Sequence, residues 1–161
     1  MKKIASVYPG TFDPITNGHL DIIERAAVIF DKVIVTVALN TNKNPLFSKE
    51  DRMDMIAKVT SKFKNVKVDS FNGLLVDYVK AIRASVIIRG LRAVSDFEYE
   101  FQMSLTNSKL DPNITTIYLM PNEKYTYLNS TLVREIARFG GNVSDFVPLY
   151  VKKKLEKTFK S

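Results

Sequence analysis

The stretch Tyr8-Pro-Gly-Thr-Phe-Asp-Pro-Ile-Thr-Asn-Gly-His19 decides the fold, because it joins two different hydrophobic patterns. Residues 4–8 before it form a short apolar run typical of a buried strand, whereas apolar residues from Leu20 to Phe30 recur at helical spacing. The stretch is therefore predicted to lead from a first strand into a first helix. In open α/β sheets such turns lie at the carboxyl edge of the strands, where helix N-termini offer unpaired N–H groups. The sequence predicts an anion site there, beside the chain's only histidine.

The rest of the chain continues this alternation of buried strands and helices. A strand followed by a helix, repeated five times, is typical of a parallel sheet covered by helices on both faces. We therefore predict an α/β fold: a single-domain, doubly wound, Rossmann-like five-stranded parallel sheet, with one domain spanning residues 1–161. The four later strands are expected at residues 33–39, 66–71, 86–88 and 114–120.

Turn-forming and capping residues locate several helix ends. Ser48, with Asp51 three residues later, is close to a capping box and predicts the start of the second helix. The third helix is expected over about residues 74–84. A fourth would stop at Asp111-Pro112, and a fifth would run from residues 129–131 to the glycine pair 140–141. Apolar residues between 146 and 155 predict a last helix.

Composition limits the class of protein. The chain has no cysteine and one histidine, which excludes a disulfide framework and a structural zinc site. The apolar stretch near the start is too short for a signal peptide or a membrane span, so we expect a cytosolic protein. A formal charge of +7 favours an acidic partner, such as a nucleotide, a nucleic acid or an anionic membrane. Charge alone does not choose among these partners.

Polar and glycine residues collect after four of the predicted strands. They are Thr11 and His19 in the opening stretch, Lys43 at the end of 40–43, the two arginines of 88–92, and the hydroxyls of 125–134. These groups would meet if the first and fourth strands are neighbours in the sheet. Guanidinium and ammonium groups bind phosphates. The sequence therefore predicts a site for more than one phosphate.

Several common nucleotide and hydrolase motifs are absent from the sequence. There is no G-x-x-x-x-G-K-[ST] loop and no G-x-G-x-x-G, so P-loop and dinucleotide-binding classes lack their motifs. No serine on a sharp turn accompanies His19, so covalent catalysis of the Ser-His-Asp type is not expected.

The motifs that are present resemble those of a known superfamily. Thr16-Asn17-Gly18-His19 resembles the H-x-G-H motif of the cytidylyltransferase-like superfamily, with threonine at its first position. Asn129-Ser130-Thr131-Leu132-Val133-Arg134 resembles its second motif, I-S-S-T-x-x-R. The string 88–93, followed by 96–100, is similar to the bacterial phosphopantetheine adenylyltransferase family, and this similarity covers essentially the whole chain.

This resemblance implies transfer of AMP from ATP to 4′-phosphopantetheine, giving 3′-dephospho-coenzyme A and pyrophosphate in coenzyme A biosynthesis, with Mg²⁺. It also implies a cytoplasmic homohexamer that takes neither nucleic acid nor membrane as a partner. It places ATP on Thr11, Phe12, His19, Gly90, Leu91, Arg92, Glu100, Tyr125, Thr126, Tyr127, Leu128, Asn129, Ser130 and Thr131. It places phosphopantetheine on Thr11, Lys43, Leu75 and Arg89, gives His19, Lys43 and Arg92 catalytic roles, and names no protein ligand of a metal.

The implied chemistry agrees with the residues present. A phosphate monoester has a second pKa of about 6, so this nucleophile is largely dianionic near neutral pH and needs no general base. We expect direct in-line attack with no covalent intermediate, in which Lys43 and Arg89 offset repulsion between the two anions. His19, at the positive end of the first helix, would donate to an α-phosphate oxygen in the transition state.

Some positions depart from the family pattern, and two other functions stay open. Asn129 replaces a serine, and 125–127 read Y-T-Y where W/Y-S-F is commoner, so we expect these departures to bear on affinity more than on reaction type. One alternative is a nucleotidyltransferase that acts on nicotinamide mononucleotide or glycerol phosphate. The other is a non-catalytic nucleotide- or RNA-binding α/β module, suggested by the charge of +7.

Overall fold

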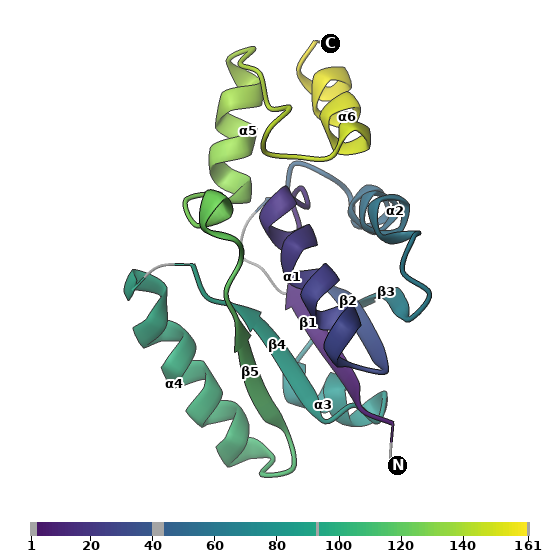
Figure 1. Ribbon diagram of the computed structural model, residues 1–161, viewed down its shortest axis with the longest axis vertical. Coiled ribbons are helices and arrows are strands. Elements are labelled where there is room, and N and C mark those ends of the chain that lie inside the picture. The colour runs from purple at the N-terminus through teal and green to yellow at the C-terminus, as the bar shows by residue number, and fades with distance from the viewer. Residues whose placement is uncertain (1–2, 40–43, 93, 161) are drawn as a thin grey trace.

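The computed structural model describes residues 3–39, 44–92 and 94–160. Its five strands form one sheet in the order β3-β2-β1-β4-β5, and every neighbouring pair is parallel (Figure 1). The strand order reverses beside β1, so the predicted doubly wound sheet is confirmed. The strands are β1 (Ala5–Gly10), β2 (Lys32–Ala38), β3 (Val66–Phe71), β4 (Val86–Gly90) and β5 (Thr115–Leu119).

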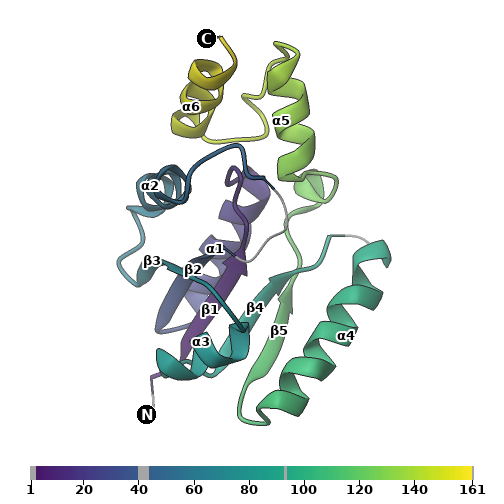
Figure 2. The ribbon, with the colours of Figure 1, turned by 180° about the vertical axis from the view of Figure 1, so that it is seen from behind.

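Helices cover both faces of this sheet, as predicted. Figure 1 shows α1 and α2 on one face, and Figure 2, from behind, shows α3 on the other with α4 alongside β5. The last two helices, α5 and α6, lie beyond the carboxyl ends of the strands. Within the described part of the chain, no helix is both long and apolar enough to span a membrane. The helices are α1 (Asn17–Ile29), α2 (Lys49–Thr60), α3 (Leu75–Ala81), α4 (Val94–Leu110), α5 (Ser130–Arg138) and α6 (Leu149–Phe159), with a 3₁₀ turn η1 (Glu123–Tyr125).

The apolar core has two parts because successive strand residues point to opposite faces. On the larger side Tyr8 and Ile88 pack with α1 and α2, and this cluster continues into α5 and α6 through Val133 and Val151. On the smaller side Val7 and Ile87 pack against α3. The uninterrupted Val/Ile runs that predicted buried strands are therefore explained by burial of both faces.

Local hydrogen bonds set the helix ends. Ser48 caps α2 as predicted, but its hydroxyl donates to the Asp51 carboxylate, so Asp51 does not complete a capping box on the backbone. The third helix ends at Ala81, earlier than predicted, because Arg83 adopts a φ of 56° and turns the chain. The fifth ends at Arg138, and Gly140 has the φ of 76° expected of a terminating glycine.

The fourth strand is longer than predicted. It runs through Arg89 and Gly90, which pair with Tyr118 and Leu119 of β5. The Arg89 side chain is therefore fixed on a strand and does not belong to the following turn.

Candidate active site

A pocket of about 540 Å³ lies at the carboxyl edge of the sheet. Its position follows from the pairing of β1 with β4, which brings the opening stretch beside Arg89 and Gly90. Thirteen of the predicted site residues line it: Thr11, Phe12, His19, Leu75, Arg89, Gly90, Arg92, Glu100, Tyr125, Leu128, Asn129, Ser130 and Thr131.

The other four predicted site residues are not among the described residues that line the pocket. Leu91, Thr126 and Tyr127 are outside the lining set. The Leu91 amide is bonded to the Leu119 carbonyl, and the Tyr127 ring packs edge-on against Phe146. Lys43 lies outside the described residues.

His19 is held by a capping box at the start of α1. Its backbone N–H donates to the Thr16 hydroxyl at 3.4 Å, and its Nδ1 accepts from the Thr16 backbone N–H at 3.1 Å. Because Nδ1 is an acceptor, the ring proton of the neutral imidazole is on Nε2. Threonine at the first position of the motif thus fixes both the orientation and the tautomer of His19.

The surroundings of His19 keep it uncharged. Burial of the ring, and then the nearby positive charge of Arg92, lower the pKa of His19 to about 4. The ring packs against Phe12, with centroids 5.1 Å apart. At neutral pH His19 is therefore a neutral Nε2–H donor, which suits a transition-state donor better than a proton shuttle.

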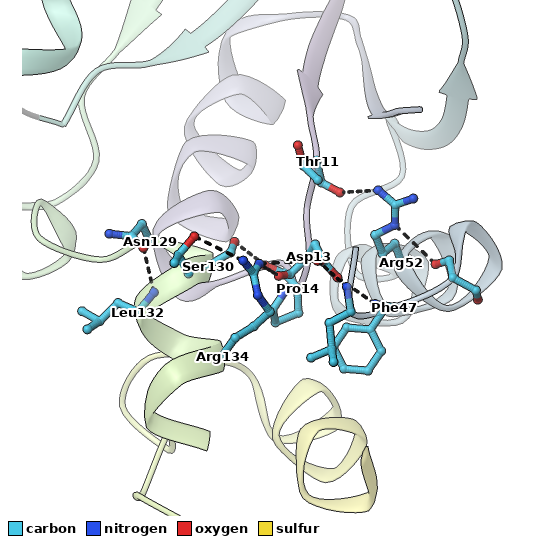
Figure 3. A network of polar contacts seen from close by, with 12 residues as sticks. Thr11, Asp13, Pro14, Phe47, Arg52, Asn129, Ser130, Leu132 and Arg134 are labelled. Carbon is cyan, nitrogen blue, oxygen red and sulfur yellow. Dashed lines mark hydrogen bonds and ion pairs between the residues drawn. The ribbon is translucent and has the colours of Figure 1, made fainter. Parts of the chain in front are cut away.

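The opening stretch is held from several sides (Figure 3). The Asp13 carboxylate is 3% exposed and accepts backbone N–H groups of Leu46 at 2.8 Å and Phe47 at 2.9 Å. Arg134 of α5 donates to the Asp13 carbonyl oxygen and lies 3.4 Å from its carboxylate. Asp13 therefore joins the segment after β2 to the helix after β5.

Two further hydrogen bonds hold the backbone on either side of Asp13. Arg52 of α2 donates to the Thr11 carbonyl at 3.0 Å, and Ser130 of α5 donates to the Pro14 carbonyl at 2.7 Å. Between them Phe12 adopts a φ of 46°, in the left-handed region that a non-glycine residue enters only at some cost. Figure 3 shows these contacts surrounding residues 11–14. Contacts from α2 and α5 offset that cost and set the shape of this pocket wall.

Asn129, which stands where the family pattern has a serine, caps the start of α5. Its side-chain oxygen accepts the Leu132 N–H at 2.8 Å, so the amide caps the helix in place of a hydroxyl. Nearby, Arg92 donates to the Leu128 carbonyl at 2.9 Å. Arg92 therefore connects the end of β4 to the segment that opens α5.

All three carboxylates that line the described part of the pocket are paired with arginines. Glu100 pairs with Arg89, Asp96 with Arg92 at 3.5 Å, and Asp13 with Arg134. The sequence predicted an excess of cations and placed Glu100 at the site, but it did not reveal these three pairings. Among the described lining residues, the charges of the arginines are balanced and no carboxylate is left without a cation.

Sequence reasoning gave no role to Asp13, Thr16 or Arg134, although all three lie in the motifs quoted above. Thr16 could have been recognised, because Ser or Thr followed three residues later by a polar side chain is a capping pattern. Asp13 and Arg134 are 121 residues apart, so no local pattern pairs them.

Comparison with known proteins agrees with the fold and the motifs. The cytidylyltransferase-like family model matches residues 7–136. A putative nicotinate-nucleotide adenylyltransferase from Vibrio parahaemolyticus superposes with a TM-score of 0.74 over 99% of this chain and 98% of that one, at 17% identity. An NMN adenylyltransferase/ADP-ribose pyrophosphatase from Francisella tularensis gives the same TM-score at 18% identity, over 99% of this chain and 50% of that one. These two likenesses establish the fold.

Sequence relatives are much closer. The phosphopantetheine adenylyltransferase of Dictyoglomus turgidum is 58% identical over 157 residues, 98% of each chain. That of Clostridium botulinum strain Eklund 17B is 58% identical over 146 residues, 91% of each chain. The chain therefore belongs to the cytidylyltransferase-like family and, within it, to the phosphopantetheine adenylyltransferases.

Proposed function

We propose that this chain transfers the adenylyl group of ATP to 4′-phosphopantetheine, giving 3′-dephospho-coenzyme A and pyrophosphate. The observation that carries the mechanism is the pairing of every described pocket carboxylate with an arginine, beside a neutral His19. Within the part of the site that the structure describes, there is no free general base and no activated nucleophile. Such a site suits a reaction whose nucleophile is already ionised, as a phosphate monoester is near neutral pH.

The chemistry is a direct exchange of one bond for another at the α-phosphorus. A phosphate oxygen of 4′-phosphopantetheine forms the new bond in line with the bond to the leaving pyrophosphate, which breaks with its electron pair. Arg89 holds the acceptor phosphate, Arg92 holds the nucleotide, and His19 Nε2–H donates to an α-phosphate oxygen as charge develops there. The assignment of Lys43 to the acceptor phosphate rests on the sequence resemblance alone.

Backbone amides supplement these side chains. The helices α1 and α5 both begin at the pocket edge, and their first N–H groups favour anions. We assign to ATP the lining residues Tyr125 and 128–131, at and before the start of α5, together with Thr11, Phe12, Gly90 and Arg92. The assignment of Leu91, Thr126 and Tyr127 to ATP rests on the sequence resemblance alone. Leu75, which lines the pocket from α3, is assigned to the acceptor arm.

Mg²⁺ is proposed as the cofactor, but the described residues offer it no protein cage. No group of three or more His, Asp or Glu side chains gathers there to ligate a metal, and the pocket carboxylates are engaged by arginines. Mg²⁺ usually keeps several waters and binds substrate phosphates. We therefore propose that the phosphates of ATP would hold Mg²⁺, which would supply charge neutralisation at the pyrophosphate.

Self-association is also proposed, as a homohexamer. On α4 the side chains of Phe97, Phe101 and Leu105 are 51%, 50% and 56% exposed, and the two phenylalanine rings stack with centroids 5.7 Å apart. A stripe of this kind supports burial against another copy of the chain. Light scattering should give six times the chain mass, and a monomeric mass would contradict the proposal.

The experiment that tests the function is pyrophosphate release with different acceptors. Purified protein, ATP and Mg²⁺ should release pyrophosphate with 4′-phosphopantetheine and not with nicotinamide mononucleotide or glycerol phosphate. Mass spectrometry should identify 3′-dephospho-coenzyme A. Release with a different acceptor would point to another nucleotidyltransferase. No release with any acceptor, together with salt-dependent RNA affinity, would indicate a binding module.

A further inference from the structure

Glu100 and Arg89 form a two-pronged ion pair inside the pocket. The carboxylate receives Arg89 Nε at 2.8 Å and Nη2 at 2.6 Å. Burial opposes the charge on Arg89, but the Glu100 carboxylate outweighs it and raises the pKa of Arg89. The negative charge of Glu100 weakens the attraction of Arg89 for a phosphate. The ion pair therefore does not serve phosphate binding through charge, and its role must be a different one.

Counting the hydrogens of the guanidinium indicates that role. A guanidinium has five N–H groups in one plane. Glu100 takes two of them, and the Pro9 carbonyl accepts a third, from Nη1, at 3.4 Å. The remaining two have no acceptor among the described residues. Since the Nε/Nη2 edge faces Glu100, the second N–H of Nη2 points to the Nη1 side of the guanidinium, and Nη1 keeps one further N–H. This Nη1 side is the free edge, and its two donors can each meet a phosphate oxygen.

Glu100 is itself fixed in place. It is 7% exposed, and its backbone carbonyl accepts the Tyr118 hydroxyl of β5 at 2.6 Å. Arg89 is anchored independently, because it lies within β4 and pairs with Tyr118 in the sheet. The ion pair therefore connects two rigid elements and leaves the guanidinium little freedom to rotate.

We infer that Glu100 is a positioning residue for Arg89, holding the guanidinium so that its free edge meets the phosphate of 4′-phosphopantetheine. The inference rests on the proposed function and refines it. The family resemblance places Glu100 among the ATP contacts, whereas the hydrogen-bond geometry places its effect on the acceptor side of the reaction.

The test is a comparison of KM values in Glu100→Gln. An amide offers Arg89 one acceptor instead of two and places an NH₂ against its other donor, so the guanidinium loses its fixed plane. The KM for 4′-phosphopantetheine should rise about tenfold, as for loss of one charged hydrogen bond, while the KM for ATP stays within about twofold. Glu98→Gln, an exposed residue of α4, removes the same charge from the same helix and should change neither constant.

Other outcomes overturn the inference. A selective rise in the KM for ATP would place Glu100 on the nucleotide, equal rises for both substrates would mean general loosening, and no change would leave Glu100 without a role. If Glu100→Gln does not fold, Tyr118→Phe removes the anchor of Glu100 and should raise the acceptor KM selectively by a smaller factor. If the wild-type protein releases no pyrophosphate, the proposed function itself fails, which is a separate result.

Discussion

Replacing Asp13 with asparagine should destabilise the protein strongly. The carboxylate accepts two backbone N–H groups, from Leu46 and Phe47, and faces the charge of Arg134 while only 3% exposed. The amide has one oxygen, so one buried N–H loses its acceptor and meets an NH₂ group. An unsatisfied buried donor costs about 1–3 kcal/mol, and the loss of the charge partner of Arg134 brings the expected total to about 3–5 kcal/mol.

Urea denaturation of wild-type protein and Asp13→Asn measures this loss directly. Asp31→Asn is the matched control, because the Asp31 carboxylate accepts a single backbone N–H, from Ile4, in an exposed setting. The control should lose far less free energy of unfolding. A change below about 1 kcal/mol in Asp13→Asn would refute the conclusion that this carboxylate holds the opening stretch in place.

Further predictions concern the reaction and its pH dependence. His19→Ala should lower kcat about 100-fold or more, as removal of an oxyanion donor does, and an unchanged kcat would show that the role is wrong. His19→Gln, whose amide supplies both an acceptor for the helix cap and an N–H donor, should lose less kcat. Arg89→Lys should raise the KM for 4′-phosphopantetheine, because an ammonium does not replace a two-pronged fork, and an unaltered KM in initial-rate assays would argue against that contact. Burial, and then the charge of Arg92, lower the pKa of His19 in the folded protein to about 4. In the unfolded chain its pKa is near 6.5, so on acidification His19 becomes protonated in the unfolded chain before it does so in the folded protein. His19 should therefore lower the free energy of unfolding as the pH falls from about 6.5 to about 4, by at most about 3 kcal/mol; urea unfolding at several pH values should show a smaller slope in His19→Gln, and an identical slope would contradict the assignment.

The sequence predicted the strands and helices well wherever a local hydrophobic pattern determines them. The apolar run of 33–39 gave a strand close to its observed bounds, since burial on both faces leaves a nearly continuous apolar run. Residues 66–71 also formed a strand at the expected bounds, although this edge strand carries Lys67 and Asp69 and is only partly buried. The third helix was predicted too long, because nothing in its sequence announces the left-handed turn at Arg83.

The sequence predicted most of the residues of the site, but it did not predict which of them form ion pairs. Arg89 and Glu100 stand in the same short string, but their pairing depends on how α4 packs beside β5. The Asp13–Arg134 contact depends on the strand order, in which only β4 separates β1 from β5, so that the segments after both strands meet at the carboxyl ends of the strands. Long-range pairing of this kind leaves no local signature, and among the described lining residues it balances the charges of the expected cationic pocket.

The most direct test of the central claim is exchange of radiolabelled pyrophosphate into ATP, with Mg²⁺ present. Direct attack predicts that label enters ATP only when 3′-dephospho-coenzyme A is added or is formed from added 4′-phosphopantetheine, because pyrophosphate must react with that product to regenerate ATP. With protein, ATP and labelled pyrophosphate alone, no label should be exchanged. Exchange in the absence of any phosphopantetheine compound would reveal an adenylylated enzyme and contradict the account of a site whose described residues offer neither a free base nor an activated nucleophile.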